Sequence, residues 1–202
     1  MSKFSVKEAI GFGWGEFKAQ WKILVPVWVT VIVVNLGLSA WQENINQALW
    51  WAVSLVALLS AAFSLVATLG TTKISLLIAR GERANYMEVF AQWRLVLKYL
   101  AAQIVVGLIT LVGFILLIIP GVIFATRLQF VVYALVDKNM GVLEAVRYSW
   151  KITSGQVWRL MVFGFAVTLV ILLGLLALGI GVVVAVGVTT VASAHVYDQL
   201  SK

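Results

Sequence analysis

Arg127 is the side chain in this sequence with the clearest potential for chemistry, because it lies inside an apolar run, 122–136. An arginine near the middle of a membrane span costs from about 2.5 kcal/mol upward and is usually directed into a helix bundle or a wet cavity. The groups that could contact its guanidinium are Gln103, Gln129, Asn35, carbonyls freed near Pro120 and a lipid phosphate. Three interpretations remain open: packing within a bundle, contact with a lipid headgroup or another anion, and extension of the side chain toward an interface.

Pro120 and Gly121 separate the apolar run 100–119 from the run 122–136. One interpretation is the break of a discontinuous helix, which in transporters exposes backbone groups for ligand binding. The other, which we favour, is a tight turn between two spans. The residues on both sides are apolar, so backbone groups freed there need partners within the protein or at the headgroups.

Few side chains could support catalysis or bind a metal ion. Hydrolases need a nucleophile held by a base, or a set of metal ligands, and the apolar runs contain no carboxylate and one histidine, His195, at the end of the last run. His195 and Asp198 are spaced to reach one metal ion, but the chain has one histidine and no cysteine. The sequence also lacks a phosphate-binding loop and a dinucleotide fingerprint. We therefore expect no enzyme activity, no metal site and no cofactor.

The composition is that of an integral membrane protein. Of the 202 residues, 62% are hydrophobic and 11% are charged, whereas charged residues make up about 25% of a soluble domain. The net charge of +7 is spread between apolar runs rather than gathered on one soluble face. We therefore expect the basic residues to meet anionic lipid headgroups and not nucleic acid.

The apolar runs predict six crossings, because about 20 apolar residues match the thickness of a bilayer core. The predicted spans are 23–39, 49–69, 100–119, 122–136, 157–176 and 181–196. The stretch 157–196 is long enough for two spans with a turn near 176–181. The helix of the second span is expected to continue to Arg80 and to project into the aqueous phase.

Amphipathic segments at 5–20, 86–98 and 141–154 precede the first, third and fifth spans. A weak internal repeat supports this unit, since residues 6–10 resemble residues 142–146. The predicted fold class is therefore all-α: a single polytopic domain, 1–202, with three membrane hairpins, each preceded by a surface helix. Three glycines weaken the first amphipathic segment, at about 1 kcal/mol each in a helix in water.

The distribution of basic residues predicts the orientation. With six crossings, fourteen of the 15 lysines and arginines lie in segments on one side, which the positive-inside rule places in the cytoplasm. Both termini and the three amphipathic segments should then be cytoplasmic. The residues expected to contact anionic lipid on this face are Arg94, Lys98, Arg147 and Lys151.

Small residues recur every fourth position on the sixth span, at Gly181, Ala185, Thr189 and Ser193. Such a stripe lets helices approach closely inside a membrane. An intramolecular contact is the first interpretation and a homodimer seam is the alternative.

A family resemblance is carried by residues 116–123 (LLIIPGVI), Arg127, Val136, Asp137, Lys138, Gly141, Glu144, Ala145, Ser149, Gly155 and Trp158. With these residues the chain resembles the bacterial family related to the membrane domain of glycerophosphoryl diester phosphodiesterase, which includes the YciC-like inner-membrane proteins. The resemblance implies a multi-span protein of the cytoplasmic membrane. In some relatives this domain is fused to a soluble phosphodiesterase. The spans and surface helices occupy these 202 residues, so we do not carry that activity over.

These observations lead to one favoured function and two alternatives. We expect a non-enzymatic protein of the bacterial cytoplasmic membrane, with a structural or accessory role in the envelope. Its expected partners are anionic membrane lipids and another membrane protein, and its oligomeric state is left open. The first alternative is a small transporter or channel for an amphiphile or anion that uses Arg127. The second, implied by the resemblance alone, is a membrane module that partners a separate glycerophosphodiester phosphodiesterase.

Overall fold

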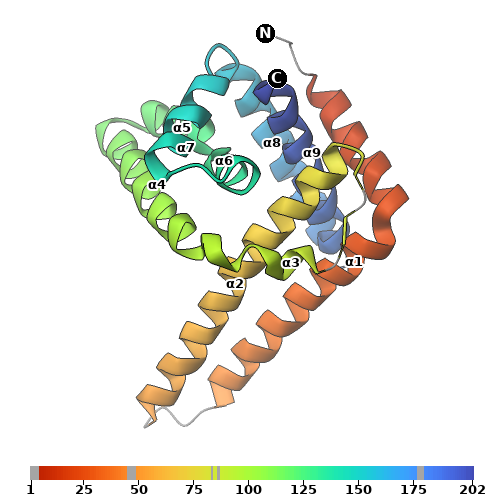
Figure 1. Cartoon of the computed structure of the whole chain (residues 1–202), viewed down its shortest axis with the longest axis vertical. Helices are drawn as coiled ribbons and strands as arrows, with labels where there is room; N and C mark the ends of the chain where they lie inside the picture. Colours follow the sequence, from red (N-terminus) through yellow and green to blue (C-terminus); the bar gives the residue numbers. More distant parts are fainter. Residues whose placement is uncertain (1–4, 45–48, 83, 86, 177–179) are drawn as a thin grey trace.

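The computed structural model describes residues 5–44, 49–82, 84–85, 87–176 and 180–202, and every regular element in these residues is helical. Six helical segments of this part of the chain are long and apolar enough to cross a membrane. The elements are α1 (Val6–Asn44), α2 (Trp50–Ala79), α3 (Glu88–Ala91), the 3₁₀ turn η1 (Trp93–Leu95), α4 (Val96–Leu116), α5 (Ile118–Leu128), α6 (Val131–Lys138), α7 (Val142–Ile152), α8 (Val157–Leu176) and α9 (Ile180–Ser201) (Figure 1).

Some expectations fall outside the described residues. The first residue of the amphipathic segment predicted at 86–98, Tyr86, is one of them. Residues 177–179, at the centre of the turn expected near 176–181, are the others. The other boundaries can be compared directly. Helices α7 and α8 lie where the sequence places the third amphipathic segment and the fifth span. Helix α9 continues to Ser201, beyond the predicted end of the sixth span.

Helix α1 combines the first amphipathic segment and the first span. The two parts meet at Gln20, whose backbone is non-helical (φ −118°, ψ 24°). Before this kink, α1 runs antiparallel to α9: the Phe12 ring stacks on His195 with 3.9 Å between centroids, and Phe17 lies against Gly187. After it, α1 pairs with α2, and the two extend together away from the other helices (Figure 1). The first segment therefore packs along a helix instead of lying free at a surface.

Gly13 makes the contact between α1 and α9 possible. A Cβ atom at this position would overlap the backbone oxygen of Val188 and lie 3.0 Å from the Cβ of Ala192. Nothing lies within 4 Å of a Cβ built on Gly11 or Gly15. Of the three glycines in this segment, one is thus required by close helix packing.

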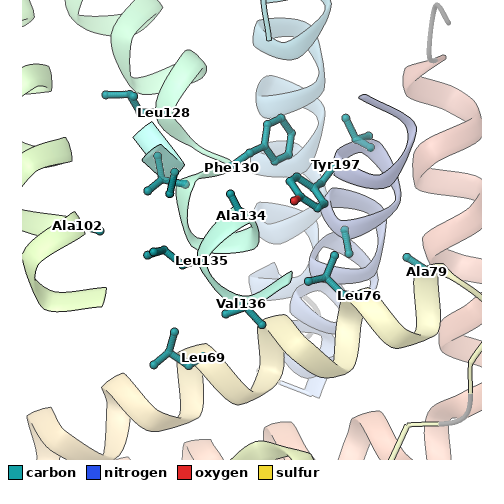
Figure 2. Close-up of a cluster of buried hydrophobic side chains, with 14 of the residues drawn as sticks. Leu69, Leu76, Ala79, Ala102, Leu128, Phe130, Ala134, Leu135, Val136 and Tyr197 are labelled. Carbon is teal, nitrogen blue, oxygen red and sulfur yellow. The ribbon is translucent and has the colours of Figure 1, made fainter. Parts of the chain in front are cut away.

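The C-terminal part of α2 was wrongly expected to project into water. Leu69, Leu76 and Ile78 are each at most 1% exposed. Figure 2 shows Leu69 and Leu76 within the apolar cluster that also contains Val136 and Tyr197. The extension is buried because α6 and α9 pack against it, so this part of α2 lies at the centre of the bundle.

The break between the third and fourth spans lies at Leu117 and not at Pro120 and Gly121. Leu117 is extended (φ −171°, ψ 158°), and α5 begins at the next residue. Pro120 therefore sits in the first turn of α5, where a backbone N–H would have no helical partner. Gly121 serves close packing, since a Cβ there would lie 2.5 Å from the Phe114 ring of α4.

A second break divides the predicted fourth span. Helix α5 ends at Leu128 and α6 begins at Val131, so Gln129 and Phe130 interrupt the helix. The sequence shows no proline or glycine there. The fourth candidate span, Ile118–Lys138, is therefore a broken helix, but its break lies nine residues after Pro120.

The segment predicted at 86–98 is not one helix, because Gln92 (φ −94°, ψ 12°) separates α3 from η1.

Gly181 and Ala185 of the small-residue stripe make an intramolecular contact, as the first interpretation of this stripe expected. A Cβ on Gly174 of α8 would lie 2.6 Å from the Gly181 oxygen and 2.7 Å from the Ala185 Cβ.

Candidate functional site

Helix α7 contacts both the side chain and the backbone carbonyl of Arg127. The guanidinium carbon lies 4.5 Å from the centroid of the Trp150 ring, a cation–π geometry that gains strength when water is excluded. The Ser149 hydroxyl donates to the Arg127 carbonyl oxygen at 2.6 Å, and the Thr153 hydroxyl approaches the same oxygen at 3.5 Å. Trp150, the main partner of the guanidinium, was not among the expected groups.

These hydroxyls explain how the break at Gln129 is tolerated. The Arg127 carbonyl lies in the last turn of α5, where carbonyls lose their helical partners. Inside a membrane protein such groups need partners from neighbouring elements. Ser149 and Thr153 are fully buried, at 0% exposure, so the inward face of α7 caps the interrupted helix.

Two of the groups expected around Arg127, Gln103 and Asn35, have other hydrogen-bond partners. The Gln103 amide nitrogen donates to the Tyr99 hydroxyl at 3.2 Å. The Asn35 amide nitrogen donates to the Val31 oxygen at 2.8 Å, and its Oδ1 accepts from Ser64. Among the residues that the structure describes, the buried Nε atoms of Arg127 and Nε2 of Gln129 have no hydrogen-bond partner. The hydrogen bonds described for Gln103 and Asn35 are therefore made with groups other than the guanidinium.

A cavity of about 330 Å³ adjoins the break between α5 and α6. Its lining consists of Trp28, Val31, Ser64, Ala67, Thr68, Thr71, Thr72, Gln129, Val132, Tyr133 and Thr190. The lining is rich in hydroxyl groups and includes no charged side chain. No local pattern in the sequence indicates this cavity, because its threonines come from α2 and α9 and meet only in the folded bundle.

An ion-pair cluster joins the ends of α2, α6 and α9. Arg80 donates to Asp137 at 2.6 Å and to Asp198 at 3.1 Å. The Tyr197 hydroxyl donates to the second Asp137 oxygen at 3.1 Å, and Lys202 pairs with Asp198 at 2.6 Å. The hydrogen bond that Arg80 donates to Asp137 raises the pKa of Arg80 above its ordinary value. The cluster therefore keeps three separate helix ends together.

A second cavity, of about 360 Å³, opens between α7 and the end of α9, and we call it the basic groove. It is lined by Tyr148, Lys151, Ile152, Gln156, Gln199, Leu200, Ser201 and Lys202. Both lysines are exposed at its edge, while Gln156 is 8% exposed. Two ammonium groups beside amide, hydroxyl and aliphatic side chains can accept an anion attached to an apolar chain.

The four basic residues expected to meet lipid have different surroundings. Lys151 lines the basic groove, and Arg147 is exposed on the same helix. Lys98 donates to the Asn139 side chain at 2.9 Å, and the Arg94 guanidinium lies 5.6 Å from the Trp93 ring centroid. Sequence reasoning did not single out Lys202, although its spacing from Asp198 was a usable signal for an i,i+4 ion pair.

The pairing of His195 with Asp198 at one metal ion receives no geometric support. Both oxygens of Asp198 are engaged by the cations Arg80 and Lys202. The His195 ring stacks on Phe12, and its Nε2 lies 2.9 Å from Nε2 of Gln199. Within the described ranges no group of three or more histidine, cysteine or acidic side chains is placed to hold a metal ion.

The chain was compared with protein-family models, with curated proteins and with solved structures. None of the three comparisons gave a match.

Proposed function

We propose that this chain is a non-enzymatic protein of the bacterial cytoplasmic membrane that binds the headgroup of an anionic lipid in the basic groove. The observation that carries the proposal is that Lys151 and Lys202 both line a cavity of about 360 Å³. Lys151 provides charge for a phosphate, Lys202 adds to it while its ammonium pairs with Asp198, and Gln156 and Ser201 can bond the rest of the headgroup. Ile152 and Leu200 provide apolar contact for the start of an acyl chain.

The proposed topology places this groove at the cytoplasmic headgroup level. We propose six crossings in three hairpins, with both termini and α7 on the cytoplasmic side. The ion-pair cluster supports this arrangement, because Arg80 and Asp137 lie in two connectors, and Asp198 in the segment after the last span, that the positive-inside rule assigns to the same side. Anionic lipids give the inner leaflet its negative surface potential, so the proposed ligand is present where the groove opens.

Native mass spectrometry of the purified protein tests the proposal. The protein in nanodiscs of phosphatidylglycerol and phosphatidylcholine is released by mild detergent, and the retained lipid is identified. We expect retention of one phosphatidylglycerol molecule. Lys151→Gln combined with Lys202→Gln should weaken its binding roughly thirtyfold, at about 1 kcal/mol for each lysine.

A matched control distinguishes a specific lipid site from general electrostatic attraction between the basic protein and anionic lipid. Lys7→Gln combined with Lys22→Gln removes the same charge from exposed positions on α1 and should leave the retained lipid in place. Equal retention of phosphatidylcholine and phosphatidylglycerol by the wild-type protein would refute lipid selection. If both double variants lost the same amount of phosphatidylglycerol, the binding would depend on the net charge of the protein and not on the basic groove.

The break at Gln129 and Phe130 favours one alternative, a small transporter or channel for an amphiphile or anion. We rank it second because Arg127 faces Trp150 and lines neither of the two cavities. Arg127→Gln distinguishes the two roles. A transporter that uses this arginine loses flux and keeps its thermal stability, whereas a packing role predicts lower stability.

A further inference from the structure

The hydroxyl-lined cavity beside the break of α5 and α6 has the properties of a ligand site that is separate from the basic groove. Its volume of about 330 Å³ lies in the range of small-molecule pockets, roughly 300–1,000 Å³. Four regions of the chain contribute to it: α1, the middle of α2, the break itself with α6, and α9. Trp28, Val31 and Val132 make part of the wall apolar.

The threonine hydroxyls of the lining present acceptors, because their hydrogens already bond backbone carbonyls. Thr71 donates to the Ala67 oxygen at 2.8 Å, and Thr72 donates to the Thr68 oxygen at 2.7 Å. Thr190 donates to its own helix in the same way, to the Val186 oxygen at 2.9 Å. A hydroxyl oxygen that donates once still has lone pairs that accept. The cavity therefore offers several acceptors to a ligand.

Gln129 supplies the complementary donor. Its Nε2 atom is buried and has no hydrogen-bond partner within the described part of the chain, and its side chain lines the cavity. A buried amide donor left without a partner is unfavourable. The break of the helix at Gln129 places this residue in the same cavity lining as the threonines of α2.

We propose that this cavity binds the hydroxyl-bearing headgroup of an uncharged lipid, of which diacylglycerol is the simplest probe. The lipid hydroxyl donates to a threonine oxygen, and a lipid oxygen accepts from Nε2 of Gln129. A phosphate does not fit, because it would face mainly lone pairs. A cation does not fit, because the lining contains no carboxylate and an unpaired charge at this depth is costly.

Lipid binding to the purified full chain tests the proposal. The protein is placed in phosphatidylcholine nanodiscs and titrated with dioleoylglycerol, with trioleoylglycerol and dioleoyl phosphatidic acid in parallel. Bound lipid is counted by native mass spectrometry, and thermal stability is followed in the same samples. We expect dioleoylglycerol to bind and stabilise. Trioleoylglycerol, which lacks the hydroxyl, should bind at least tenfold more weakly.

Gln129→Leu should weaken dioleoylglycerol binding about tenfold, which corresponds to one lost hydrogen bond. The free protein should be at least as stable as the wild type, because the substitution removes an unpaired buried donor. Thr72→Val removes one acceptor and should also weaken binding, and it decides the question if Gln129→Leu fails to fold. Thr168→Val is the matched control: Thr168 donates to the Gly164 oxygen at 3.0 Å on α8 and does not line the cavity.

Three results would overturn the proposal. They are equal binding of dioleoylglycerol by the wild type and both cavity variants, a preference for phosphatidic acid, and stabilisation by sodium in the absence of lipid. Loss of phosphatidylglycerol retention in the Lys151 and Lys202 variant leaves this proposal intact, because those lysines lie in the other cavity.

Discussion

Substitution of Gly13 by alanine tests the contact between α1 and α9 most directly. A Cβ atom at this position would overlap the Val188 backbone oxygen and would lie 3.0 Å from the Ala192 Cβ, whereas ordinary Cβ contacts begin at 3.4 Å. The first obstacle is backbone, so a side-chain rotation cannot relieve the overlap and the two helices must separate. Overpacking of this kind costs about 1–3 kcal/mol.

Gly11→Ala is the matched control, two residues away on the same helix. Nothing lies within 4 Å of its new Cβ, and replacing glycine by alanine in an exposed helix position gains about 1 kcal/mol. If Gly13→Ala costs about 2 kcal/mol, the two variants differ by about 3 kcal/mol, or roughly 6–12 °C in Tm for a chain of this size.

Thermal unfolding of both purified variants in one detergent, followed by size-exclusion chromatography or by intrinsic fluorescence, measures this difference. Gly13→Ala should unfold below the wild type and Gly11→Ala should unfold above it. A Gly13→Ala protein as stable as Gly11→Ala would show that α1 does not pack on α9 at this position.

Three further predictions concern the ion-pair cluster, the capped break and the topology. A double-mutant cycle of Arg80→Gln and Asp137→Asn should give a coupling of about 2 kcal/mol in the free energy of unfolding. This value lies between exposed and fully buried pairs, because the two side chains are 32% and 8% exposed; coupling under about 0.5 kcal/mol would contradict the structure. Ser149→Ala should lower stability by about 1–2 kcal/mol, because it removes the closer of the two hydroxyls at the Arg127 carbonyl, and an unchanged Tm would count against this capping role. In a chain without native cysteine, Asn85→Cys should react with a membrane-impermeant thiol reagent only from the cytoplasm and Gln42→Cys only from the other side; labelling of both from one side would refute the proposed topology.

The pattern of apolar and charged residues predicted the six candidate spans well, because span length follows from bilayer thickness alone. It predicted α7 and α8 almost to the residue, since the amphipathic pattern of residues 141–154 and the apolar run that starts at 157 mark these elements. It did not predict the break at Gln129, because an apolar run carries no local signal for where neighbouring helices interrupt it.

The partners of the polar residues were harder to predict for a related reason. Arg80 meets carboxylates that are 57 and 118 residues further along the chain, and no local spacing rule connects such positions. Arg127 meets Trp150 because the buried face of α7 turns toward α5. The amphipathic pattern of residues 141–154 identified that helix but not the element that it covers.

The ion-pair cluster has a consequence for biosynthesis. A ribosome delivers Arg80 to the membrane surface well before it delivers Asp137, and delivers Asp198 last of the three. Until then the guanidinium lacks one of its two carboxylates, and the end of α2 lacks α9, one of the helices that bury it in the finished bundle. Compaction of the whole molecule is therefore a late, post-insertion event that waits for α9, and a nascent chain arrested before this helix should be held as loosely associated hairpins and be readily cleaved by membrane proteases.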